Sequence, residues 1–168
     1  MKGRTTQLVA ISAVMAGMTV SALAAEIHKE FHFNVAPKAG VMVNNPYGSI
    51  SVKPSTGDVV VVRAVLASDK VEVDNSLVGN RVEIQSHLLT GANESSGRVD
   101  YEILVPADST ITLHSSSGAL HAEKIHGDVS LEGSAATVDV RDITNAHVHV
   151  KTLNGPVTLT NVQDGRRS

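Results

Sequence analysis

Histidine is the residue type in this sequence whose number and spacing best fit a chemical role. The chain has eight histidines in 168 residues, and all of them follow Glu26. His147 and His149 stand two positions apart, so on a β-strand both imidazoles would share one face. A His-x-His pair with a carboxylate nearby can bind Zn²⁺ or Cu²⁺. The opposing interpretation is a solvated strand face on which histidine serves only as a polar residue.

An internal repeat lets a third histidine, His121, be placed on the predicted fold. With Gly48 placed over Gly118, both segments show a glycine, an alternating apolar stretch, a Gly-Asp pair at the same distance from that glycine and a second alternating stretch. Further copies begin at Ala136 and Gly155, so that from Gly118 onward successive copies start at steps of 18 and 19 residues. The units are residues 48–62, 118–132, 136–150 and 155–164.

Stacking is the physical reason for such a repeat. Each unit has two short strands whose alternate side chains point inward, and one unit alone cannot bury them. Stacked units would bury three columns: Leu120–Val138–Val157, Ala122–Val140–Leu159 and Ile125–Ile143–Val162. We therefore predict an all-β fold, a single-stranded right-handed β-solenoid (β-helix-like) with coils of about 18–19 residues. A β-sandwich is the alternative, because Val-rich sandwich strands also alternate.

Glycine and aspartate mark the expected corners of these coils. Glycine can adopt the positive φ that a tight bend requires, and aspartate can accept backbone N–H bonds there. The predicted turn residues are Gly48, Gly57, Asp58, Gly118, Gly127, Asp128 and Gly155. The third unit departs from the pattern with Ala136 in place of glycine, which leaves the geometry of one corner open.

The alignment also places polar residues side by side on the outside of the stack. The third residue after each unit's first position would form an outward ladder of Ser51, His121, Asp139 and Thr158. His121 and Asp139 would then be neighbours on adjacent coils. The candidate metal ligands are therefore His121, Asp139, His147 and His149, although nothing in the sequence places His121 and His147 in one coordination sphere.

The N-terminus has the pattern of an export signal. Lys2 and Arg4 precede an uncharged stretch over residues 8–25, which ends in the small-x-small sequence Ala22-Leu23-Ala24. We expect cleavage of residues 1–24, a mature domain over residues 25–168 and a periplasmic, secreted or cell-envelope location. An uncleaved membrane anchor is the alternative, but the stretch is barely long enough and is diluted by Gly, Ser and Thr. After cleavage we expect no stable membrane span.

Composition excludes several classes of function. The absence of cysteine excludes disulfides, thiolate metal sites and thiol nucleophiles. Two Phe, two Tyr and no Trp are too few for the aromatic platforms of sugar-binding and single-strand-binding proteins, and a net charge of −3 argues against a nucleic-acid partner. The short turns leave little wall for the groove of a polysaccharide hydrolase or lyase. We identify no catalytic residue and no cofactor.

Several motifs in the middle of the chain resemble those of a known protein family. Residues 101–106 (Tyr-Glu-Ile-Leu-Val-Pro), residues 111–113, Ser116-Ser117-Gly118 and the successive Gly-Asp-Val steps resemble a bacterial family of exported β-solenoid domains. That family is catalogued as adhesins and its function is unknown. The resemblance covers about residues 41–162, loosely over 63–89. It implies a right-handed solenoid with glycine turns and no enzymatic activity.

The leading interpretation is therefore an exported, non-catalytic, adhesin-like binding module with an unknown protein or envelope partner. An envelope metal-binding protein that uses the histidine face, and a carbohydrate-active β-helix enzyme, are the alternatives. The fourth unit stops after Val162, so we expect self-association, or a partner that adds a strand, at this C-terminal solenoid end. Whether the stack is continuous through residues 63–113 stays open.

Overall fold

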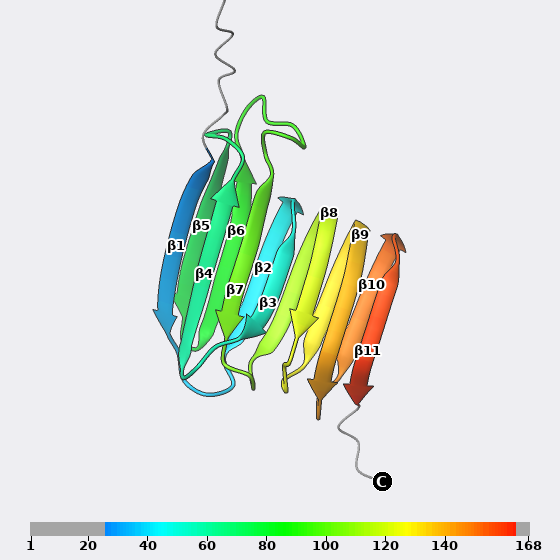
Figure 1. The fold of residues 1–168 in the computed structure, drawn as a ribbon. Helices are drawn as coiled ribbons and strands as arrows, with labels where there is room; N and C mark the ends of the chain where they lie inside the picture. Colours follow the sequence, from blue (N-terminus) through cyan, green and yellow to red (C-terminus); the bar gives the residue numbers. More distant parts are fainter. Residues whose placement is uncertain (1–25, 164–168) are drawn as a thin grey trace, which may run out of the picture.

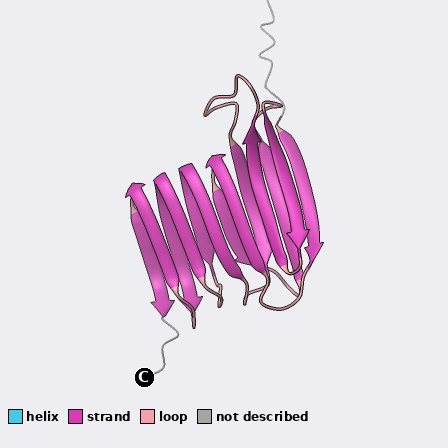
Figure 2. Ribbon diagram, turned by 180° about the vertical axis from the view of Figure 1, so that it is seen from behind, coloured by secondary structure: helices cyan, strands magenta, loops and turns pink. Residues whose placement is uncertain are grey.

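The structure is a computed structural model that describes residues 26–163. The predicted signal peptide, residues 1–24, lies outside the described residues. The described chain consists of strands and loops (Figure 2), which confirms the all-β prediction. Within residues 26–163 no helix is long and apolar enough to cross a bilayer.

Eleven strands form one mixed sheet that folds back on itself around an apolar core (Figure 1). They are β1 (Ile27–Asn34), β2 (Gly40–Tyr47), β3 (Ile50–Pro54), β4 (Val59–Leu66), β5 (Val71–Val78), β6 (Arg81–Leu88), β7 (Val99–Val105), β8 (Thr110–Glu123), β9 (Val129–Thr144), β10 (Val148–Asn154) and β11 (Val157–Gln163). The strands belong to a single hydrogen-bonded sheet, so the sandwich alternative, with its two separate sheets, does not describe this fold.

The C-terminal third of the chain is a parallel stack of coils. Strand β8 pairs with β9 along its length, and β9 pairs in the same parallel sense with β10 through its first half and with β11 through its second half. Leu120 lies beside Val138 and Val138 beside Val157, as the alignment predicts. Because β8 and β9 bend halfway, each contributes one strand segment to either side of the core.

The first repeat unit stacks directly on the second, although β5, β6 and β7 lie between them in the sequence. Ile50 of β3 pairs with Leu120 in parallel register, and the same stacking extends to the strand before the unit, where Val41 of β2 pairs with Ile111. The second half of this unit behaves differently from the alignment. Val59 begins β4, which runs antiparallel to β1 and β7 instead of lying over Val129. Within residues 63–113 the pairing is mixed. Strands β6 and β7 pair in parallel with β2 and β3, so one more parallel layer lies against the first unit, whereas β4 pairs antiparallel with β7 and β5 with β6.

One corner of the stack depends on close backbone approach. Gly48, Gly118 and Gly155 have φ of 108°, 129° and 137°. A Cβ on Gly118 would lie 2.1 Å from the carbonyl oxygen of Gly48, and a Cβ on Gly155 would lie equally close to that of Ala136. Ala136 itself keeps a negative φ. Room for its methyl group comes from Gly133, where a Cβ would lie 2.4 Å from the Ala136 Cβ.

The opposite corner uses residues other than glycine. Lys124, Asp142 and Asn161 have φ of 55°, 53° and 53° and follow each other at the coil spacing. Asn161 Nδ2 donates to Asp142 Oδ1 at 2.7 Å, which ties two coils together. The prediction of positive φ at Gly127 was wrong. Its lack of a side chain is needed because a Cβ would lie 2.1 Å from the carbonyl oxygen of Ser109.

A buried polar network crosses the core between β2, β6 and β7. Ser86 Oγ lies 2.8 Å from Tyr101 Oη and donates to Asn45 Oδ1 at 2.9 Å, while Asn45 Nδ2 donates to the carbonyl oxygen of Val99 at 2.8 Å. Burial raises the pKa of Tyr101 to about 12, although its hydrogen bond with Ser86 works in the opposite direction. The phenol is therefore kept neutral as part of the core.

The glycine corner is tested by two alanine substitutions. Gly118→Ala introduces both positive-φ strain and a clash with backbone, so we expect it to lower the free energy of unfolding by about 3 kcal/mol or more. Gly57→Ala, at φ +90 with nothing within 4 Å, introduces the strain alone, and we expect a loss of about 1 kcal/mol. Urea unfolding measures both. Equal losses would show that close approach is not what requires glycine at position 118.

The buried tyrosine predicts a loss of stability in alkali. Its pKa rises from 10.0 to about 12 on folding, so its contribution is complete below pH 10 and is lost as the pH rises towards 12. This rise in the pKa of Tyr101 corresponds to about 3 kcal/mol of folding free energy. We expect Tyr101→Phe to cost about 1 kcal/mol at pH 7, for the lost hydrogen bond, and to flatten this pH dependence. Parallel alkaline profiles for the two proteins in urea unfolding would contradict the assignment.

Candidate functional site

A continuous row of outward side chains crosses one side of the sheet, one residue from each of seven strands. In strand order the row consists of Glu30, Arg63, Glu102, Ser51, His121, Asp139 and Thr158, and we call it the polar row. Every neighbouring pair in it is a register pair of the sheet. The predicted ladder from Ser51 to Thr158 is therefore present and forms the C-terminal part of a longer feature.

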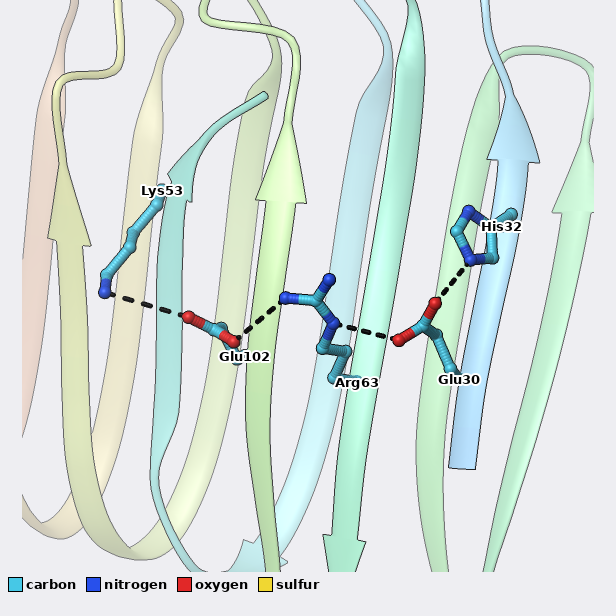
Figure 3. Close-up of polar contacts among 5 residues, drawn as sticks. All are labelled: Glu30, His32, Lys53, Arg63 and Glu102. Atoms are coloured by element: carbon cyan, nitrogen blue, oxygen red, sulfur yellow. Dashed lines mark hydrogen bonds and ion pairs between the residues drawn. The ribbon is translucent and has the colours of Figure 1, made fainter. Parts of the chain in front are cut away.

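The first half of the polar row is a chain of ion pairs (Figure 3). Arg63 of β4 donates from Nε to Glu30 Oε2 on β1 at 2.9 Å, and its Nη1 lies 3.4 Å from Glu102 Oε2 on β7. Lys53 Nζ lies 3.8 Å from Glu102 Oε1, and His32 Nε2 lies 2.6 Å from Glu30 Oε1. These contacts link four adjacent strands across the open face. Arg63 is the central cation, since it is shared by two carboxylates.

The ion pairs shift the pKa values of Glu30 and Arg63. The hydrogen bond from Arg63, followed by that with His32, lowers the pKa of Glu30 below its ordinary value. The hydrogen bonds to Glu30 and Glu102 in turn raise the pKa of Arg63. Both groups are therefore fully ionised at neutral pH. A carboxylate held in this way is poorly suited to act as a general acid, which needs a raised pKa.

His121 occupies the centre of the second half. Its Nδ1 lies 3.4 Å from Asp139 Oδ2 on the adjacent strand, and its Nε2 lies 3.4 Å from Glu123 Oε2 on its own strand. The two carboxylates therefore approach opposite nitrogens of the ring and do not converge on one point. Arg141 holds Asp139 with two contacts of 3.0 and 2.7 Å and is the main cause of the lowered pKa of Asp139.

The other two candidate metal ligands lie elsewhere. His147 precedes β10, and Asp128 Oδ1 accepts a hydrogen bond from its backbone N–H at 2.9 Å, which is the main cause of the lowered pKa of Asp128. His149 is exposed on β10, beside Ser130 in the first segment of β9. His121 pairs with the second segment of β9, beyond the bend. Among the described residues no group of three or more His, Cys, Asp or Glu is placed to hold a metal ion.

An open hollow of about 420 Å³ lies against the first half of the polar row. Its lining includes His28, Lys29, Ser49 and Asp100 besides the charged residues of the row. Partial burial raises the pKa of Asp100. The hydrogen bonds from the backbone and hydroxyl of Ser49 and the ion pair with Arg98 lower it by more, so the pKa of Asp100 lies below its ordinary value. The hollow thus offers fixed charges and hydrogen-bonding groups for contact with another molecule.

Sequence reasoning missed Glu30, Arg63 and Glu102. Glu30 and Glu102 come from strands outside the repeat units, and Arg63 directly follows the first unit. Two of the three strand pairings that join them to one another and to Ser51 are antiparallel. The alternation of charged and apolar residues in β1, β4 and β7 indicates which side chains point outward. It does not indicate which strands are neighbours.

Comparison with solved structures finds two bacterial proteins that match this chain. A candidate cell adhesion protein from Clostridium sporogenes superposes with a TM-score of 0.50 at 14% identity, over 82% of this chain and 100% of its own. The two chains share a fold. A candidate adhesin from Bacteroides fragilis matches over 82% of this chain and 97% of its own, at 6% identity and a TM-score of 0.27. No family model and no curated protein matches this sequence.

The central role of Arg63 in the polar row can be measured by titration. We expect Arg63→Gln to raise the pKa of Glu30 towards its ordinary value, because the largest cause of the lowering is removed. Lys53→Gln is the matched control: it removes a cation that contacts Glu102 alone, so Glu30 should titrate as in the unaltered protein. Carboxyl chemical shifts followed by NMR against pH give both values. An unchanged Glu30 pKa in Arg63→Gln would show that the ion pair does not form in solution.

Proposed function

We propose that this chain is an exported, non-catalytic binding module of the bacterial envelope or cell surface, which contacts its partner through the polar row. We also propose that its coils wind as a right-handed β-solenoid of the adhesin-like family that the sequence resembles. The observation that carries the proposal is the polar row itself, a continuous line of charged and hydrogen-bonding side chains across seven strands.

The geometry of the row favours an extended partner. Neighbouring strands lie about 4.8 Å apart, so seven strands hold the row's side chains over a line of ~30 Å. Because every strand of the row is hydrogen-bonded to the next strand of the row, the spacing of these groups changes little on binding. Such an arrangement fits a linear envelope polymer or a flat protein surface that offers charges of both signs.

Two further observations support the assignment. The parallel pairings from β8 to β11 repeat with a nearly constant length of chain between partners, as the coils of a solenoid do. The Clostridium protein that shares the fold is described as a candidate cell adhesion protein, which favours a similar role here. Export is proposed from residues 1–24, which have the charge, apolar stretch and cleavage pattern of a signal peptide.

The proposal is tested by co-sedimentation of the purified protein with bacterial envelope fragments. The triple variant Glu30→Ala/Arg63→Ala/Glu102→Ala removes the charges of the row. The matched control Glu72→Ala/Arg81→Ala/Glu83→Ala removes the same charges from exposed positions on β5 and β6. We expect saturable retention that falls at least tenfold in the row variant and is unchanged in the control.

Two outcomes would overturn this assignment. Equal retention of the row variant and the control would show that binding, if any, does not use the row. Release of new sugar reducing ends from the fragments, abolished by the row substitutions, would show that the face is catalytic.

A further inference from the structure

The last coil, made of β10 and β11, differs from the coils below it in what covers it. Val138 and Val140 are completely buried, whereas their equivalents in the last coil, Val157 and Leu159, are 42% and 52% exposed. Within residues 26–163, β10 and β11 each pair with β9 alone, so one edge of each strand is free. Both strands lie at one end of the molecule (Figure 1).

This end has few of the features that normally prevent strand pairing, since Pro156 lies at the corner outside both strands and the positive φ of Asn161 falls near the C-terminal end of β11. Edge strands are usually protected by charged residues, proline or bulges. Strands β10 and β11 have seven residues each, and Lys151 is the only one that carries a formal charge. The edge strands at the other end are charged: β1 contains Lys29 and Glu30, and β5 contains Glu72 and Asp74. The contrast identifies the β10–β11 end as the one that can accept another strand.

From these observations we infer that the β10–β11 end binds a second copy of this chain, and that the two coils join by antiparallel strand pairing. A single added strand could cover only one of the two free edges. A second copy presents two strands of the same lengths, held at the same separation by the same corner at Gly155. Both edges can then pair at once, and Val157 and Leu159 of each copy become covered by the other.

The corner at Gly155 and the charge of Lys151 together determine how the two copies are oriented. A two-fold axis that lies between the two sides of the coil, parallel to the strands, makes the paired strands antiparallel and places β10 of one copy against β11 of the other. Lys151 then faces the uncharged strand β11 of the partner, whereas the alternative pairing of β10 with β10 would bring two Lys151 side chains close together. Because the axis is two-fold, assembly stops at two copies.

The inference is independent of what the polar row binds, and it is tested on the purified protein by sedimentation velocity over a range of concentrations. We expect a dimer that dissociates on dilution. Leu159→Lys places a charge in the contact and should make the protein monomeric. Leu77→Lys, the same substitution at a 40% exposed leucine on β5, should leave the dimer unchanged. A monomer at every concentration, growth beyond two copies, or dissociation by Leu77→Lys alone would overturn the inference.

Cross-linking tests the pairing without a charged substitution in the core. The chain has no cysteine, so introduced thiols report on the contact alone. Lys151 and Thr158 lie at exposed positions on the two strands and at similar distances from Gly155. We expect disulfide-linked dimers from Lys151→Cys/Thr158→Cys and none from either single variant. A dimer linked through Lys151→Cys alone would show β10 against β10 and would overturn the proposed arrangement.

Discussion

The structure depends on how closely the backbone of one coil approaches the next at the glycine corner. The carbonyl oxygen of Gly48 occupies the place that a Cβ on Gly118 would take, and the carbonyl oxygen of Ala136 does the same at Gly155. This contact fixes one coil on the next without freedom to slide. A shift of one residue would turn the inward side chains outward, so the corner protects the burial of the whole core. Ala136 shows how strict the requirement is, because its one methyl group is matched by the missing side chain of Gly133.

A fixed register has opposite consequences on the two faces of the sheet. Inside, most equivalent positions are apolar, and Leu120, Val138 and Val140 are accordingly buried completely, whereas Asn45 and Ser115 form a buried polar pair of positions. Outside, equivalent positions form rows that can carry any polar residue without disturbing the core. The polar row occupies such outward positions. Its first part, from Glu30 through Arg63 to Glu102, lies on antiparallel strands, at positions beyond the repeat. The side chains that stabilise the core and those that are open to contact with another molecule are therefore alternate residues of the same strands.

The parts of the fold that could be predicted are those set by local spacing. The nearly constant step of the repeat was enough to place Val138 beside Leu120 and Asp139 beside His121, because parallel coils of constant length leave one register. Strands β4 to β7 could not be placed in the same way, although β6 and β7 pair in parallel with β2 and β3, since their neighbours come from tertiary packing and no repeat records them. The positive φ of Lys124 and Asp142 was missed because only glycine was expected to adopt it. The ion pair of Glu30 with Arg63 followed from the same unpredicted pairing of β1 with β4.

The two ends of the sheet show that charge placement follows the need for protection as well as for binding. At the β1 and β5 end, charged residues on the outermost strands make the approach of a further strand unfavourable, since their charges would have to be paired or desolvated. The polar row begins at this end with Glu30. This one ionised residue therefore both disfavours strand pairing at the edge of β1 and contributes to the outer face. Towards β11 the row ends in Thr158, and the coil there keeps apolar side chains on its inner face. The contrast between the charged outermost strands β1 and β5 and the nearly uncharged strands β10 and β11 therefore separates an end protected from strand pairing from an end suited to another apolar coil.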